Sequence, residues 1–169
     1  MKAISAPLHY MLLQAVLSTL LATWPQASGA VIRLVDVAEQ AGIRLLNICG
    51  GAAKDYIVEV NGNGAAFFDY DNDGDVDALI VNGSTLSNMK QGGDQMIALF
   101  RNDGNGHFAD VTRASGLSAR GWGMGTCIAD YDNDGFQDAY VTAFGPNVLV
   151  HNNGDGTFAD VTARAGGRP

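Results

Sequence analysis

The sequence is poor in the residues on which several common kinds of site depend. Among its 169 residues only two are cysteines, Cys49 and Cys127, and only three are histidines. The cysteine spacing gives no support for a zinc site. No Ser-His-Asp or Cys-His arrangement for nucleophilic catalysis can be found either. We therefore predict that the chain is not an enzyme.

Basic residues are also scarce. Lysine and arginine number 10 against 18 acidic residues, which gives a formal net charge of −8. Binding to phosphate groups needs clustered Lys and Arg, so nucleic acid is not an expected partner. Nine of the 18 acids lie in two short segments, five in residues 69–77 and four in residues 130–138. The negative charge is therefore mainly a local property of these two segments.

Long hydrophobic runs are confined to the first thirty residues. Lys2 precedes a mostly apolar stretch, Leu8–Leu21, and small residues follow at 27–30. This pattern is typical of a secretory signal peptide, and the stretch is short and polar for a membrane span. We expect residues 1–30 to be a helical signal peptide, a retained anchor being the lesser alternative. The mature chain is then secreted, periplasmic or on the cell surface, without membrane contact.

The two acidic segments have the same pattern. Residues 69–77 (DYDNDGDVD) and 130–138 (DYDNDGFQD) place carboxylates at positions 1, 3, 5 and 9 and glycine at position 6. This is the first part of the spacing with which a loop wraps oxygen ligands around Ca²⁺. Gly74 and Gly135 allow the sharp turn, and a cation would offset the repulsion between carboxylates. The alternative is a pair of solvated Asp/Asn/Gly turns.

Each loop is expected to use the acid at position 9 as its closing ligand and the backbone carbonyl of position 7 as another. Either an aspartate or a phenylalanine can then occupy position 7. The predicted metal ligands are Asp69, Asp71, Asp73, Asp75 and Asp77 in the first loop and Asp130, Asp132, Asp134, Phe136 and Asp138 in the second.

The surroundings of the loops exclude an EF-hand. Position 12 falls on Ile80 and Val141, and the segments that follow both loops favour strands over helices. A dockerin-like or thrombospondin-type calcium module has helical or irregular flanks and more closely spaced loops. The strand-like flanks and the offset of 61 residues from Asp69 to Asp130 speak against that alternative.

Further internal repeats surround the loops. Residues 102–112 (NDGNGHFADVT) match residues 152–162 (NNGDGTFADVT), and residues 34–42 are a weaker third copy of the end of this motif. Internal repetition of this kind points to repeat folds, propellers included. Each unit divides into four expected strands: 65–68, 78–81, 96–101 and 107–111 in the first, and 123–129, 139–143, 148–151 and 157–161 in the second.

These expectations define an all-β fold: a partial β-propeller of two four-stranded antiparallel blades with a leading outer strand. After the signal peptide, residues 31–63 form the leading strand and a linker, 64–116 the first blade and 117–166 the second. An oxidising compartment permits a bridge between Cys49 and Cys127. Because Cys127 falls in a predicted core strand, we favour a small buried hydrophobic residue instead.

The combination of motifs resembles a known family. The resemblance is carried by Lys54–Glu59, Asn61-Gly62, Ala66–Asp75, Gly123–Gly125, Phe144–Asn147 and both Gly-x-Gly-x-Phe-x-Asp-Val-Thr hairpins. The chain is similar to the FG-GAP/VCBS repeat proteins, and in particular to the cartilage acidic protein-like (ASPIC/UnbV) group. The resemblance covers nearly all of the mature chain and implies a calcium-binding β-propeller, usually of about seven blades, similar to the integrin α head.

The chain carries only about two such blades. This favours a truncated reading frame or an N-terminal fragment, the alternatives being a ring of several chains or an open partial sheet. We expect a secreted, calcium-binding module that binds a protein or glycan ligand, with possible self-association to cover blade edges. The alternative function is a fragment of a calcium-bearing propeller polysaccharide lyase or other hydrolytic enzyme.

Overall fold

The computed structural model describes residues 32–61 and 63–166, in two units that divide after Asp36. The first unit contributes only the described residues 32–36, which form no helix or strand. All elements discussed below belong to the second unit. The predicted signal helix lies outside the described residues. Within the described ranges, no helix has the length and apolar character needed to cross a membrane.

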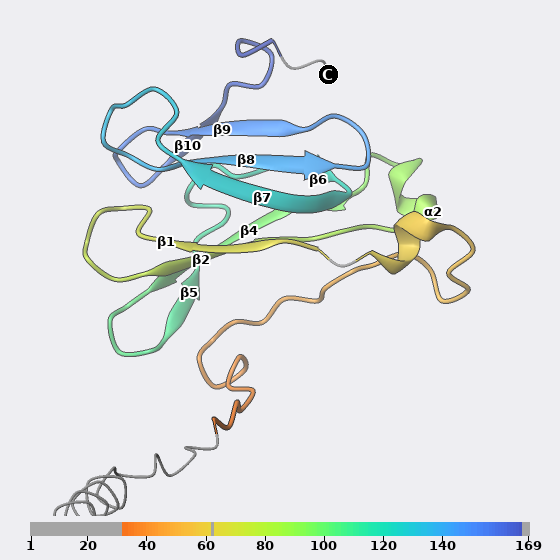
Figure 1. Ribbon diagram of the computed structural model, residues 1–169, viewed down its shortest axis with the longest axis horizontal. Helices are drawn as coiled ribbons and strands as arrows, with labels where there is room; N and C mark the ends of the chain where they lie inside the picture. The colour runs from red at the N-terminus through yellow and green to blue at the C-terminus, as the bar shows by residue number, and fades with distance from the viewer. Residues whose placement is uncertain (1–31, 62, 167–169) are drawn as a thin grey trace, which may run out of the picture. The chain divides into compact units, whose positions relative to one another are not determined.

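The second unit contains two four-stranded antiparallel sheets that lie one over the other (Figure 1). The first sheet has the order β1-β2-β4-β5, and the second has the order β10-β9-β8-β7. Their strands are β1 (Ala65–Phe68), β2 (Asp77–Val81), β4 (Ile97–Asn102), β5 (Phe108–Asp110), β7 (Gly123–Ala129), β8 (Asp138–Ala143), β9 (Val148–Asn152) and β10 (Phe158–Asp160). The predicted all-β, blade-like fold is confirmed, and the predicted ends of the eight blade strands are correct to within one residue.

The remaining elements are short. The 3₁₀-helix η1 (Ile57–Val60) precedes the first sheet, and the helix α2 (Leu86–Met89) follows β2. A two-stranded sheet, β3 (Asp94–Gln95) with β6 (Arg120–Gly121), joins the insertion of the first blade to the segment that enters the second. The loops β1–β2 and β7–β8 lie at the end of the sheets opposite to η1 and α2 (Figure 1).

Two details of the prediction are wrong. No strand forms in the described residues between 32 and 64, and residues 38–42 form a turn instead of a leading strand. A fourth strand needs a third one beside it, and no described residue upstream of this segment supplies one. The prediction of a buried Cys127 also fails. Cys127 is exposed, because its side of β7 faces away from the first sheet. Both Cys127 and the half-buried Cys49 are free thiols.

The core lies between the two sheets, on alternating residues of their strands. Leu79 and Leu99 of the first sheet and Val141 of the second are completely buried there. Close approach of the innermost strands requires small residues. A Cβ atom added at Gly64 would lie 2.7 Å from the Gly125 Cα, far inside van der Waals contact. The glycine-rich inner strands thus let the sheets pack directly against each other.

A turn that recurs at the end of each repeat forms, in its first two copies, a hydrogen bond to the outer strand of the following sheet. The turns that end in Gly42, Gly116 and Gly166 repeat the same hydrogen bonds, with the Ser115 N–H donating to the Val111 carbonyl at 2.8 Å in the middle copy. The Ser115 carbonyl then accepts from the Phe158 N–H at the start of β10, at 2.8 Å. In the first copy the Ala41 carbonyl accepts from the Phe108 N–H in the same way. The turn therefore fixes the position of the outer strand that follows.

We expect Leu79→Ala to lower the free energy of unfolding by about 2–5 kcal/mol, because it opens a cavity between the sheets. The matched control is Thr142→Ala. Thr142 lies on β8, two residues after Tyr140, which is the counterpart of Leu79 in the second blade. Thr142 is exposed, and the control is expected to change stability by no more than about 0.5 kcal/mol. Urea unfolding followed by circular dichroism measures both. Equal losses would contradict a core between the two sheets.

Candidate metal centres

The loop between β1 and β2 is held by its own first carboxylate. Asp69 accepts hydrogen bonds from the backbone N–H groups of Asp73, at 3.1 Å, and Gly74, at 2.9 Å. Asn72 and Gly74 have positive φ angles of 56° and 94°, which Asn and Gly tolerate. The chain therefore turns sharply inside the loop. The loop between β7 and β8 repeats these bonds at the same distances through Asp130, Asp134 and Gly135.

A buried carboxylate at the start of the second strand closes each loop. Asp77 is completely buried and accepts from the Tyr70 N–H at 3.0 Å and from the Asn102 N–H at 2.7 Å. Tyr70 lies in the loop and Asn102 at the end of β4, so one side chain joins the loop to the third strand. Asp138 makes the equivalent bonds to Tyr131 and Asn152 at the same distances.

Three carboxylates converge in each loop. Asp69, Asp71 and Asp77 bring one carboxylate oxygen each within 4.8 Å of one another. These are positions 1, 3 and 9 of the pattern, as predicted. The equivalent residues of the second loop, Asp130, Asp132 and Asp138, form the same group. The structure thus brings together six of the predicted side-chain ligands, in two separate sets of three.

The predicted ligands at positions 5 and 7 lie differently. Asp73 is outside the first group, and its Oδ1 accepts from the Asp75 N–H at 2.9 Å. Asp134 makes the same bond to Phe136 in the second loop. The side chain at position 7 lies over the glycine of the hairpin between strands three and four. A Cβ atom added at that glycine would touch Asp75 Oδ2 at 2.6 Å in the first blade, and the Phe136 ring at 2.5 Å in the second. Carbonyl ligation by these two residues stays a prediction.

The comparison with protein families agrees with this repeat. A family model described as FG-GAP-like repeat matches residues 69–141 and again residues 130–169. Together the two matches span residues 69–169, more than half of the chain, and both contain an acidic loop. The chain belongs to the FG-GAP-like repeat family. No curated protein matches it. Membership in the narrower ASPIC/UnbV group stays a prediction.

Two carboxyl groups of the first FG-GAP loop, those of Asp71 and Asp77, have raised pKa values. Burial raises the pKa of Asp71, and the charges of Asp73 and Asp69 raise it further. Its Oδ1 atom is shielded from solvent and makes no hydrogen bond within the described chain. Burial also raises the pKa of Asp77, against the lowering effect of the N–H groups of Tyr70 and Asn102. A bound cation would remove this penalty, because it stabilises the ionised form of both groups.

The donor set fits a hard divalent cation. The converging atoms are all carboxylate oxygens, which suit Ca²⁺, Mg²⁺ and Mn²⁺. The orphaned oxygen of Asp71 points to a missing partner of this kind, since buried polar atoms are normally paired. The FG-GAP loops thus provide two clusters that could hold a metal ion.

Sequence reasoning missed one residue near the second loop. His151 on β9 places its Nδ1 atom 3.2 Å from Asp138 Oδ1 and 3.4 Å from Asp132 Oδ2, and its Nε2 atom 3.8 Å from Asp134 Oδ2. The sequence held a signal for it, because His151 directly precedes the asparagine that binds the buried Asp138. Recognising this required the pairing of the loop with β9, which only the tertiary structure shows.

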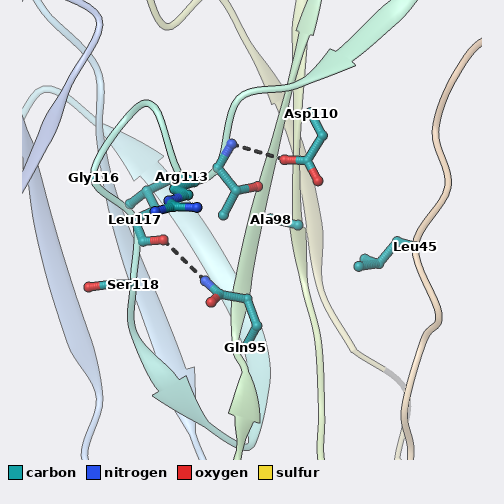
Figure 2. A pocket seen from close by; sticks show the side chains of 9 residues that line it. Leu45, Gln95, Ala98, Asp110, Arg113, Gly116, Leu117 and Ser118 are labelled. Carbon is teal, nitrogen blue, oxygen red and sulfur yellow. Dashed lines mark hydrogen bonds between the residues drawn. The ribbon is translucent and has the colours of Figure 1, made fainter.

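A pocket elsewhere on the first FG-GAP unit has a structural explanation. Asp110 accepts a hydrogen bond from the Thr112 N–H at 3.0 Å, and the Gln95 side chain donates to the Leu117 carbonyl at 3.1 Å. Figure 2 marks both bonds with dashed lines. Both contacts hold the turn that follows β5. Asp110 and Arg113 are the ionisable residues among those that line the pocket.

The pKa shift of Asp71 gives a pH prediction for the metal-free protein. Its folded pKa lies above the unfolded one, so ionisation destabilises the fold as pH rises through this range. In chelator at neutral pH, Asp71→Asn should therefore melt at a higher temperature than the unchanged protein. The gap should close as the pH falls through the range in which this aspartate becomes protonated. Thermal unfolding followed by circular dichroism measures this gap.

Asp75→Asn is the control for this measurement, since Asp75 lies outside the converging group. It should change the melting temperature less than Asp71→Asn at neutral pH. A melting difference for Asp71→Asn that did not vary with pH would contradict the electrostatic explanation.

Proposed function

We propose that the chain is a secreted, non-catalytic calcium-binding module that binds a protein or glycan ligand. The observation that carries the proposal is the repetition of the carboxylate group. Two loops, 61 residues apart, arrange positions 1, 3 and 9 in the same way and through the same hydrogen bonds. Solvated turns have no need to bring three ionised side chains within 4.8 Å, since the arrangement costs Coulomb energy without a cation.

Calcium suits these loops better than magnesium. The donors come from an irregular loop and a strand end, with the backbone carbonyl of position 7 as a further oxygen. Ca²⁺ accepts six to eight oxygens in irregular geometry, whereas Mg²⁺ requires near-octahedral ligation and keeps several waters. Extracellular calcium is also abundant enough for weak sites. The signal-like segment at residues 1–30 supports export to such a compartment.

The bound ions would stiffen one end of the module. Each ion would cross-link the loop to β2 or β8 through the closing aspartate, which is itself bonded to the third strand. The two loops also meet, because the Asn72 side chain donates to the Gly135 carbonyl at 3.4 Å. Metal binding at one loop therefore supports the position of the other.

Binding surfaces for a ligand lie away from the ions. FG-GAP repeats are typically involved in ligand or protein interaction. At the opposite end of the sheets, an apolar pocket is lined by η1, α2 and Phe144. Tyr56, Ile57 and Phe144 are respectively 62%, 82% and 48% exposed, a cluster of the kind that binds partners. This surface supports an interaction role.

The outer face of the second blade supports association with a second copy of the chain. Tyr131 and Tyr140 are 46% and 42% exposed on it. Their counterparts in the first blade, Tyr70 and Leu79, are buried against the second sheet. A blade-like partner, including another copy of the chain, would bury the same positions.

Calcium titration by isothermal calorimetry tests the metal proposal. We expect two binding events, and one fewer in either Asp71→Ala or Asp132→Ala. The double variant should show no binding heat. At a calcium concentration a hundredfold above the dissociation constant, each site should stabilise the fold by about 2.7 kcal/mol, which chelator removes.

Asp75→Ala serves as the matched control, because its side chain lies over the hairpin glycine and outside the converging group. It should keep both binding events. Unchanged binding in the double variant, or a melting curve that does not respond to chelator, would refute calcium binding at these loops.

A further inference from the structure

The two loops share one backbone design but differ at a residue on the neighbouring strand. Arg101 and His151 occupy equivalent places on β4 and β9. Each precedes the asparagine whose N–H binds the buried closing aspartate, at 2.7 Å in both blades. Each also pairs across the hairpin with an alanine, Ala109 or Ala159. The comparison therefore isolates one side chain in two matched environments.

In the first blade this side chain is a permanent cation. Arg101 is exposed, and its charge lowers the pKa of Asp71, against the larger effects that raise it. A guanidinium offers no lone pair to a metal. The first loop accordingly offers oxygen ligands only, and the charge of Arg101, which acts on Asp71, repels cations.

In the second blade the same place holds a potential ligand. The His151 side chain is 19% exposed and lies among three carboxylates of the loop. Its Nδ1 atom is shielded from solvent and lies at ion-pair distance from Asp138 and Asp132, 3.2 Å and 3.4 Å, without forming a hydrogen bond to either. The ligand atoms of Asp132, Asp134 and His151 lie within 4.8 Å of one another. Asp132 belongs both to this group and to the group of three aspartates.

We propose that the second loop is a mixed nitrogen–oxygen site that binds a borderline divalent transition ion, of the class of Co²⁺, Ni²⁺ or Zn²⁺, through His151. Imidazole nitrogen favours these ions over Ca²⁺, whereas carboxylates alone favour hard ions. Because Asp132 is shared, the transition ion and calcium compete for this loop. The first loop lacks the nitrogen donor and takes hard ions only.

This inference rests on the proposed function, since it requires that the loops bind metal. The test uses the full chain, stripped with chelator and then dialysed, and Co²⁺ as the probe. Cobalt reports its ligands through its absorption spectrum, and calorimetry gives its affinity. We expect one Co²⁺ ion to bind through nitrogen and oxygen ligands, in competition with calcium. His151→Arg, which installs the residue of the first blade, should weaken that binding roughly tenfold or more.

Two further variants complete the design. Arg101→His places an imidazole beside the first loop and should add a second Co²⁺-binding event. His107→Arg is the control, because His107 is an exposed histidine of the β4–β5 hairpin and should not alter Co²⁺ binding. Circular dichroism of each variant in calcium confirms folding, so that a lost site is not a lost fold.

Several outcomes would overturn the inference. These are a wild-type Co²⁺ affinity in His151→Arg, an intense thiolate charge-transfer band that assigns the ion to cysteine, or loss of binding in His107→Arg. Calcium titrations of the same samples distinguish failure of this inference from failure of the proposed calcium-binding function. If calcium binds both loops while Co²⁺ ignores His151, only this inference fails. If neither ion binds, the proposed metal function fails with it.

Discussion

The buried carboxylate that closes each loop is the constraint on which both blades depend. Asp77 and Asp138 are almost completely removed from solvent, and an unpaired charge at such a position would be very costly. Each is satisfied by two backbone N–H groups, one from the loop and one from the third strand. The loop therefore cannot form its acidic group without the correct pairing of strands two and three. Fold and candidate metal site are one structure, so a cation in the loop would also stabilise the sheet.

The same geometry links one blade to the next. The Asn152 side chain donates to the Tyr70 carbonyl, 82 residues away, and to the Gln137 carbonyl beside its own loop. The Tyr70 ring stacks on Phe158, with the ring centroids 6.1 Å apart. Tyr70 itself lies between Asp69 and Asp71, the first two carboxylates of the first loop. The first acidic loop thus also contributes contacts to the second sheet.

The sequence predicted most of this fold because its signals are local. Alternating aspartates, a glycine at position 6 and short runs rich in β-formers determine the loops and strands within about ten residues. What it failed to predict depends on contacts between distant segments. Residues 38–42 carry a copy of the motif that follows an outer strand, yet they form only the turn, because no described strand lies beside the preceding segment. Cys127 sits in a strand that looks like core, but its exposure depends on which face of β7 meets the first sheet. His151 becomes relevant only when β9 is placed against the loop.

The two blades show how a repeat can change its chemistry without changing its backbone. The corresponding loop hydrogen bonds have the same lengths in both blades, and the φ angles of the loop glycines, 94° and 93°, differ by one degree. Besides Val76, to which Gln137 corresponds, the side chains differ at two places around the loop. Asp75 is replaced by Phe136, whose ring covers the hairpin glycine and removes one negative charge from the second loop. Arg101 is replaced by His151, which exchanges a fixed cation for a nitrogen donor. A strongly acidic loop beside an arginine favours a hard ion, whereas a less acidic loop beside an imidazole favours a softer one. Because the frame is held by backbone N–H groups and glycines, both replacements could arise without disturbing the fold.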